Sequence, residues 1–239
     1  GLIFPFEAIS LTAVDVEVFK IYNNNILQFL QTNELDGNYD LYRVGRVIMQ
    51  KKIDLSSLNA RGRSTEWTRY ALDLSTLIEQ DPEAMYQVRI GFRPAYSTYF
   101  CSADSQVGSA VSDDLGGFEE EKLNEDGEYK SILDSWYGIE GWYDGYSWSH
   151  RDDPCFPAYY NSDRFLQRNV IASNLGIIAK GGNDKSYFVS VADLRTTEPL
   201  SNVELEFYDF QQQLLTTTQT GGDGTATVQL SRKPFVVIA

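Results

Sequence analysis

The sequence predicts an all-β protein of two antiparallel β-sandwich domains joined by an irregular segment rich in aromatic and acidic residues. Over residues 174–239, short apolar and β-branched runs alternate with turn clusters, which leaves no room for crossover helices. The 15 tyrosines and 13 phenylalanines favour strands. The length of 239 residues accommodates two sandwiches of roughly 100 residues each.

The first block, residues 1–101, is predicted to form one sandwich. Residues 13–22 alternate apolar and polar side chains, so we expect one face of this strand to be buried and the other solvated. Three consecutive asparagines then predict a turn, after which residues 26–31 are expected to return as the hairpin partner. Ser75 is a candidate cap of a short helical turn over residues 75–80. Further strands are predicted over residues 44–55, 69–74 and 85–93, with a polar loop over residues 35–43.

The middle block, residues 102–168, is predicted to be an irregular insertion or linker. Its first part is rich in Ser, Gly and acidic residues and shows little periodicity, which is typical of a surface excursion. Its second part is crowded with aromatic residues, and exposed rings of this kind can stack on sugars. The alternative, which we favour, is that these rings pack against a sandwich. The candidates for an aromatic binding surface are Trp136, Trp142, Tyr143 and Trp148.

The last block, residues 169–239, is predicted to be a second sandwich that lacks its last strand. The Gly-Asp-Gly sequence at residues 222–224 predicts a tight hairpin that needs a positive φ angle. A seventh strand is expected beyond Ala239 in a longer polypeptide, which would leave an exposed edge beside the last strand. The six predicted strands cover residues 175–180, 186–193, 203–208, 214–220, 225–230 and 235–239.

The two cysteines, Cys101 and Cys155, allow two interpretations. A disulfide between them would tie the irregular segment to the first sandwich and remove roughly 4 kcal/mol of unfolded-state entropy. The alternative is a pair of buried free thiols. Neither cysteine lies in a C-x-x-C pair, and His150 is the single histidine, so no zinc site is expected.

No catalytic, metal or cofactor site is predicted. Ser149, His150 and Asp152 are close in sequence, whereas catalytic triads converge from separate elements, and no G-x-S-x-G motif is present. Residues 124–128 do not fit the EF-hand pattern and are interpreted as a turn. No pattern fixes two carboxylates at the separation that a glycosidase requires.

Charge and hydropathy exclude two further classes of partner. The formal net charge of −14 repels phosphate backbones and disfavours nucleic-acid binding. No run of about 18 apolar residues is present, so no membrane-spanning segment is predicted. The sequence shows no signal peptide, and both ends are strand-like, so any targeting signal is expected to lie outside this sequence.

Several segments resemble the bacterial alpha-2-macroglobulin family. The runs SNLGIIAK, VADLRTTEPLSNVELEFYDFQQQLL and GGDGTATVQL, at residues 173–180, 191–215 and 221–230, resemble a macroglobulin-like domain. Upstream, AVDVEVFKIYNNNILQFLQTNELDG at residues 13–37 resembles the domain that precedes it. Three shorter elements are also similar: DLYRVGR, FRPAYS and DDPC, at residues 40–46, 92–97 and 152–155. The resemblance covers nearly the whole chain in order, and residues 102–147 are its variable part.

The resemblance implies a non-catalytic scaffold fragment of a large protease trap that is periplasmic or attached to the cell envelope, often through a lipid anchor. In such proteins a protease cleaves a bait region and the molecule rearranges around it. Some members then capture the protease through a Cys–Gln thioester, but the C-x-E-Q motif is absent here. The expected partners are neighbouring macroglobulin-like domains of the same chain and, through the complete protein, proteases. A carbohydrate-binding or adhesion-type surface module is the alternative.

Overall fold

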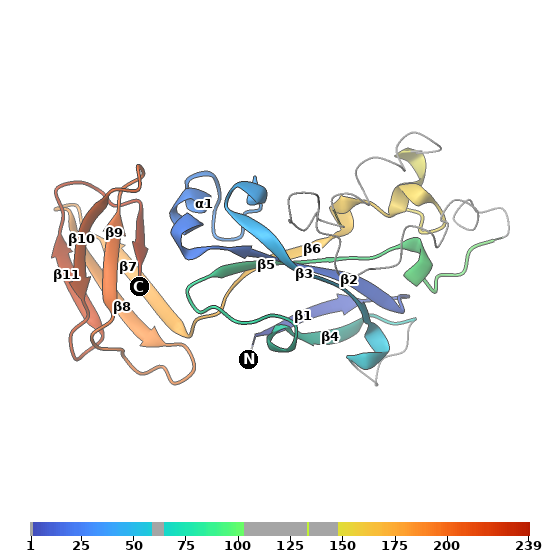
Figure 1. Ribbon diagram of the computed structural model, residues 1–239, viewed down its shortest axis with the longest axis horizontal. Coiled ribbons are helices and arrows are strands. Elements are labelled where there is room, and N and C mark those ends of the chain that lie inside the picture. The colour runs from blue at the N-terminus through green and yellow to red at the C-terminus, as the bar shows by residue number, and fades with distance from the viewer. Residues whose placement is uncertain (1, 59–64, 103–132, 134–147) are drawn as a thin grey trace. The chain divides into compact units, whose positions relative to one another are not determined.

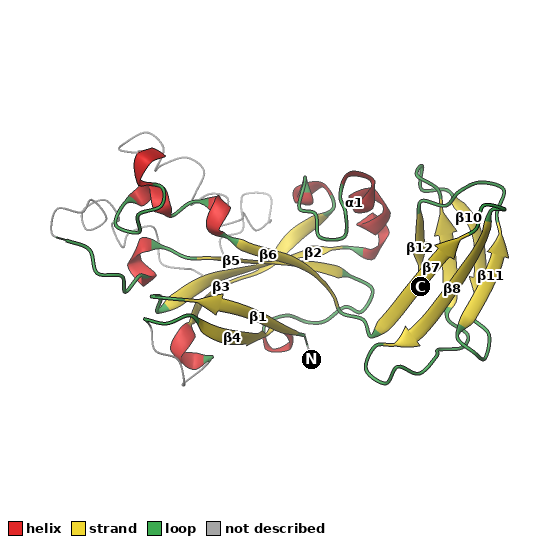
Figure 2. Ribbon diagram, turned by 180° about the vertical axis from the view of Figure 1, so that it is seen from behind, coloured by secondary structure: helices red, strands yellow, loops and turns green. Residues whose placement is uncertain are grey.

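The computed structural model describes residues 2–58, 65–102, 133 and 148–239. It consists mostly of antiparallel strands with few helices, which confirms the predicted all-β class (Figures 1 and 2). The chain divides into two compact units, one formed by Gly1–Asn23 and Leu35–Ala172 and the other by Asn24–Glu34 and Ser173–Ala239. The three-part division predicted at residues 1–101, 102–168 and 169–239 stays a prediction.

The first unit contains a four-stranded and a two-stranded antiparallel sheet. The larger sheet has the order β3-β2-β5-β6, and the smaller one pairs β1 with β4. Their facing sides enclose one apolar core, in which the ring of Phe6 stacks on that of Tyr70 at 5.4 Å between centroids. The strands are β1 Ile3–Ala8, β2 Ala13–Ile21, β3 Gly45–Asp54, β4 Thr68–Asp73, β5 Met85–Gly91 and β6 Leu166–Ile171.

The predicted return strand over residues 26–31 is wrong, because this segment is the helix α1 Ile26–Thr32. Ile26, Leu27, Phe29 and Leu30 recur at helical spacing, and Phe29 is completely buried. The three asparagines before them form a 3-10 turn, Asn23–Asn25, that leads into the helix. Within the second unit, Gln31 Nε2 donates a hydrogen bond to the carbonyl oxygen of Phe210 at 2.5 Å.

Short 3-10 helices occupy many of the connections between strands. The turn predicted over residues 75–80 is the 3-10 helix Leu74–Thr76, and Asp73 caps it instead of Ser75. The carboxylate of Asp73 accepts hydrogen bonds from the backbone nitrogen and the hydroxyl of Ser75, at 3.0 and 2.5 Å. The other 3-10 helices in the described residues are Leu41–Arg43, Leu55–Ser57, Pro94–Tyr96, Trp148–His150, Pro157–Tyr159 and Ser162–Arg164.

The second unit is a sandwich of two three-stranded sheets with the orders β11-β8-β7 and β10-β9-β12. Val189 and Val191 of one sheet and Leu205 and Phe207 of the other are fully buried between them. The six predicted strands are confirmed, each end lying within one residue of its predicted position. They are β7 Leu175–Gly181, β8 Ser186–Asp193, β9 Glu204–Tyr208, β10 Leu214–Gln219, β11 Thr225–Gln229 and β12 Val236–Ile238.

The predicted hairpin between β10 and β11 is wrong, although the tight turn between them is present. Gly224 has a φ angle of +70°, and its nitrogen donates to the carbonyl oxygen of Gly221 at 3.0 Å. However, β10 pairs with β9 and β11 pairs with β8, so the turn carries the chain from one sheet to the other. The close approach of Gly224 to Val191, whose nitrogen donates to the Gly224 carbonyl oxygen at 2.8 Å, holds this crossover in place.

The last strand, β12, lies at an edge of its sheet and pairs with β9 along one side, which confirms the predicted edge. The strand expected beyond Ala239 stays a prediction. Across the described parts of the chain, the helices are too short and too polar to reach through a lipid bilayer.

Candidate functional site

The polar side of β2 is buried, contrary to the predicted solvated face. The residues Asp15 and Glu17 are 2% and 1% exposed, although they alternate with apolar residues as an exposed row would. Each carboxylate has a basic partner on a neighbouring segment that is more than 70 residues away in sequence. The alternation of apolar and polar residues therefore separates the two faces of β2 correctly, but it does not reveal that both faces are buried.

Asp15 is held by two groups from the segment after β5. Arg93 Nε donates to Oδ2 of Asp15 at 2.5 Å, and the hydroxyl of Tyr96 donates to Oδ1 at 2.8 Å. Burial raises the pKa of Asp15 above its ordinary value, and the charge of Arg93 opposes this effect. Burial, followed by the negative charge of Asp15, also raises the pKa of Tyr96, which keeps the phenol protonated as the donor.

Glu17 forms a rung of polar contacts across three strands. It lies opposite Gln50 of β3 and Arg89 of β5, and the two donate to its carboxylate oxygens at 2.9 and 3.2 Å. A slip of one residue in either pairing would separate a buried charge from its partner. The contacts of Glu17 with Gln50 and Arg89 therefore fix the register of the central strands, which is a structural role.

A second buried polar group connects β5 and β6 to the loop before β3. Gln87 Nε2 donates to Asn169 Oδ1 at 3.0 Å, and Asn169 Nδ2 donates to the carbonyl oxygens of Leu35 and Gly37 at 2.9 and 2.8 Å. A pocket of about 450 Å³ lies on this face, with Asp40, Arg89 and Gln87 among its lining residues. These contacts anchor the loop to the sheet.

The predicted cysteine pair, Cys101 and Cys155, is a disulfide in the structure, with 5.5 Å between the Cα atoms. The segment that follows Cys155 is further ordered by Arg164, whose guanidinium lies 3.9 Å from the ring centroid of Tyr159. Arg164 Nη2 also donates to Asp152 Oδ1 at 2.9 Å and to the carbonyl oxygen of Arg151 at 2.8 Å. The segment thus presents a fixed set of aromatic rings beside the end of β5.

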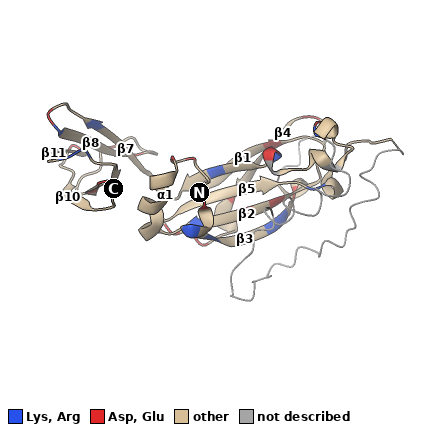
Figure 3. Ribbon diagram, turned by 90° about the horizontal axis from the view of Figure 1, so that it is seen from above, with Lys and Arg blue, Asp and Glu red and all other residues tan. Residues whose placement is uncertain are grey.

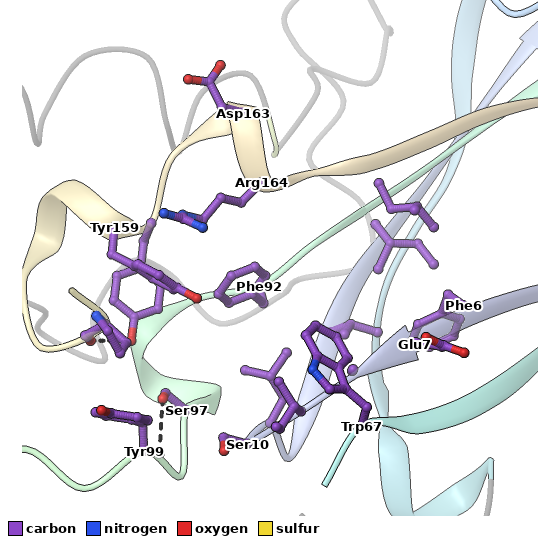
Figure 4. A pocket seen from close by; sticks show the side chains of 18 residues that line it. Phe6, Glu7, Ser10, Trp67, Phe92, Ser97, Tyr99, Tyr159, Asp163 and Arg164 are labelled. Atoms are coloured by element: carbon purple, nitrogen blue, oxygen red, sulfur yellow. Dashed lines mark hydrogen bonds between the residues drawn. The ribbon is translucent and has the colours of Figure 1, made fainter. Parts of the chain in front are cut away.

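These rings form one wall of a pocket of about 490 Å³, which we call the aromatic pocket (Figure 4). The pocket extends down to the apolar core of the first unit, because some of its lining residues are buried core residues. Its size lies within the range of 300–1,000 Å³ that is common for ligand sites. The buried part of the lining is Phe6, Ala8, Val14 and Ile90, and the aromatic walls are Trp67, Phe92, Tyr99, Tyr159 and Tyr160.

Charged side chains lie around the aromatic pocket. Glu7 of β1 and Asp163 are exposed and lie on different sides of it, and Arg164 is already engaged by Asp152 (Figure 4). Figure 3 shows how acidic and basic positions are distributed along the ribbon. Among the residues that line the pocket, two are acidic, Glu7 and Asp163, and one is basic, Arg164. The exposed Arg69 of β4, which lies opposite Glu7, adds a second basic group beside the pocket.

Of the four residues predicted to form an aromatic binding surface, the structure describes one, Trp148. Trp148 is 67% exposed, and the guanidinium of Arg151 lies 4.0 Å from its ring centroid. Trp136, Trp142 and Tyr143 lie outside the described residues, as does the turn at residues 124–128. His150 stacks on Phe156 at 3.9 Å, and Asp153 N donates to the carbonyl oxygen of His150 at 3.1 Å. A role of these aromatic residues in binding stays a prediction.

Sequence reasoning missed the residues of the aromatic pocket. Trp67, Phe92 and Tyr159 come from separate segments, and no local pattern links them. The runs FRPAYS and DDPC supply Phe92 and Pro154 to the pocket, but their resemblance to family elements does not indicate that they lie close together. Within the described ranges, no cluster of His, Cys, Asp and Glu has the arrangement of a metal site.

Comparison with known proteins gives a family for the second unit. Residues 172–239 match the family described as bacterial alpha-2-macroglobulin MG3 domain. The sandwich formed by these residues therefore belongs to the bacterial alpha-2-macroglobulin family. This confirms the resemblance for the elements at residues 173–180, 191–215 and 221–230, and it agrees with the two-sheet sandwich that β7 to β12 form.

Two solved chains of native alpha-2-macroglobulin from Escherichia coli are also similar. The chain spanning domains NIE to MG1 is 14% identical with a TM-score of 0.46, and the match covers 98% of this chain and 81% of that one. The chain spanning MG0, NIE and MG1 is 13% identical with a TM-score of 0.46, and the match covers 96% of this chain and 51% of that one. Similarity this low carries no argument about function. A search of curated proteins finds no match.

Proposed function

We propose that this chain is a non-catalytic scaffold part of a bacterial alpha-2-macroglobulin, a broad-spectrum inhibitor that entraps endopeptidases. The observation that carries the proposal is the family match of residues 172–239 to the MG3 domain. In this proposal the chain supplies rigid β-sandwich units, and its partners are neighbouring macroglobulin-like domains of the same polypeptide. Proteases interact with the complete protein.

The interior of the first unit supports a structural role. The buried carboxylates Asp15 and Glu17 are each engaged by a basic side chain and by a further hydrogen-bond donor. Buried carboxylates that are paired in this way fix strand register. The absence of the C-x-E-Q motif from the sequence means that thioester capture would need residues outside it.

The proposed location is the periplasm or the cell envelope, with any lipid anchor attached through another part of the protein. The disulfide between Cys101 and Cys155 supports this proposal, because disulfides persist in oxidising compartments such as the periplasm.

An inhibition assay with the purified 239-residue chain tests the scaffold role. The chain is incubated with trypsin, and cleavage of a protein substrate and of a small chromogenic peptide is followed. We expect both rates to stay unchanged at a molar excess of the chain. Inhibition of either cleavage by the chain alone would show that it carries its own inhibitory surface and would refute the scaffold role.

A further inference from the structure

We propose that the aromatic pocket and the adjoining edge of β1 form a docking site for an extended peptide that carries a bulky apolar side chain flanked by basic residues. The proposal concerns the first unit alone and is independent of the proposed scaffold function. It rests on the lining of the pocket, the hydrogen-bonding edge of β1 and the charge of the rim.

The lining of the pocket suits an apolar side chain. Its inner part is made by Phe6, Ala8, Val14 and Ile90, all of which are less than 10% exposed and belong to the core of the first unit. A group that enters would therefore extend the core and lose contact with water. A sugar would bring hydroxyls against these apolar atoms, where they would lack hydrogen-bond partners.

Two of the aromatic residues that line the pocket are exposed and come from different segments of the chain. Trp67 and Tyr99 are 69% and 53% exposed, although both belong to its lining (Figure 4). Exposed rings of this size beside an apolar pocket are typical of recognition sites, because tryptophan and tyrosine contribute large contact area with little loss of side-chain entropy.

The backbone of β1 offers hydrogen bonds beside the pocket. The Leu74 nitrogen donates to the Leu2 carbonyl oxygen, so the even-numbered residues of β1 bond to β4 and the odd-numbered ones point to the other edge. Pro5 has no N–H to offer at that edge, which leaves the half of the strand around Glu7 as the usable part. Glu7 and the residues that follow it line the pocket, whereas no residue within β4 does.

The edge of β1 opposite β4 lies where a further strand could be added to the two-stranded sheet. A two-stranded sheet faces a four-stranded one, and Ile90 of β5 and Leu166 of β6 remain in the lining of the pocket. A peptide paired with Glu7 would place alternate side chains toward these residues, as in other cases of strand addition. One apolar side chain would enter the pocket while its neighbours point to solvent.

The charged residues around the pocket determine which peptide residues are favoured next to the apolar side chain. Glu7 and Asp163 are exposed, whereas the guanidinium of Arg164 is engaged by Asp152 and lies over the ring of Tyr159. Arg69, which lies opposite Glu7 in the β1–β4 pair, already takes part in an interaction within the chain. The whole chain carries a formal net charge of −14. Lysine or arginine on either side of the apolar residue therefore complements the site.

Fluorescence anisotropy of a dye-labelled, blocked pentapeptide tests the proposal on the full chain. The probe has phenylalanine at its centre, a lysine on either side and threonine at both ends. We expect saturable binding that is weakened about tenfold when serine replaces the phenylalanine, when glutamates replace the lysines, or when N-methyl groups block its backbone amides. Absence of saturable binding, or equal binding of the serine peptide, would overturn the proposal.

Matched variants locate the site. Trp67→Ala and Glu7→Lys are expected to weaken binding about tenfold. Trp148→Ala, which removes an equally exposed indole outside the pocket, and Glu79→Lys, which reverses another exposed charge, are expected to change it by less than about twofold. Equal effects of Trp67→Ala and Trp148→Ala would contradict the assignment of the site.

Two further experiments test for other ligands of the pocket. Concentration-dependent dimerisation in sedimentation velocity that is lost in Trp67→Ala would show that a second copy of the chain fills the pocket. Binding of neutral oligosaccharides that is lost in the same variant would show a sugar site. Either result, in the absence of peptide binding, would overturn the proposal.

Discussion

Tyr96 donates its hydroxyl hydrogen to Oδ1 of Asp15 at 2.8 Å, and both residues are buried although 81 positions separate them in sequence. Removal of this donor by Tyr96→Phe leaves a buried carboxylate oxygen with one hydrogen bond fewer. We expect the free energy of unfolding to fall by about 1–3 kcal/mol, as measured by urea denaturation. Tyr99→Phe, at an exposed phenol, serves as the control. Equal stability of the two variants would mean that the contact with Asp15 contributes nothing.

Gly224 allows a second matched comparison. Its φ angle is +70°, and a Cβ atom there would lie 2.6 Å from the carbonyl oxygen of Val191. Gly224→Ala should therefore destabilise the second unit by at least about 2 kcal/mol and increase amide hydrogen exchange in β8 and β11. A Cβ atom at Gly222 would meet no atom within 4 Å, so Gly222→Ala should have little effect. Similar exchange in both variants would contradict this account of the crossover.

The disulfide should stabilise the first unit. For a sequence separation of 54 residues, the chain-entropy model gives about 4 kcal/mol. All four tryptophans belong to the sequence of the first unit, so their fluorescence reports on its unfolding. We expect a reducing agent, or the double change Cys101→Ser and Cys155→Ser, to lower the thermal midpoint of this signal. An unchanged midpoint under reducing conditions would show that the bond does not stabilise the fold.

Two turn carboxylates in the second unit should make its stability depend on acid pH. Asp223 accepts hydrogen bonds from the hydroxyl and nitrogen of Thr225, and Asp184 does the same with Ser186, which lowers the pKa of each carboxyl below its ordinary value of 3.8. A carboxyl whose pKa is lower in the folded state stabilises the fold above its unfolded pKa, and this contribution disappears as the pH falls through the folded pKa.

The double variant Asp184→Asn and Asp223→Asn should therefore flatten the acid side of the stability profile. Amide hydrogen exchange of the second unit between about pH 2 and pH 6, corrected for intrinsic rates, measures this effect. We expect the variant to be less protected than the wild type near pH 6 and to approach it at the acid end. A constant difference across the range would contradict the assigned pKa shifts.

Local sequence signals predicted the second unit well because its strands are short and each is bounded by turn residues. The sheet to which each strand belongs was not predictable in the same way. The turn at Gly224 has the composition of a hairpin, but the pairing of β10 with β9 and of β11 with β8 depends on contacts that local sequence does not encode. The helix Ile26–Thr32 was missed because the asparagines before it suit a hairpin turn as well as a helix start.

The first unit shows a second limit of sequence reasoning. The burial of Asp15 and Glu17 depends on Arg93 and Arg89, which lie 78 and 72 positions away. The aromatic pocket likewise gathers Trp67, Phe92 and Tyr159 from separate segments. The disulfide partners were predictable because the chain has two cysteines. The family of residues 172–239 was recognisable because several of its sequence elements occur there in the right order.

The most direct test of the central proposal is a protease assay with the alpha-2-macroglobulin of which we propose this chain is a part. The protein is incubated with trypsin at equimolar ratio, and cleavage of casein and of a small chromogenic peptide is measured in parallel. An entrapping inhibitor should reduce the cleavage of casein and leave cleavage of the small peptide unchanged, because only the small substrate reaches an enclosed protease. Unchanged cleavage of casein, or equal inhibition of both substrates, would contradict the account.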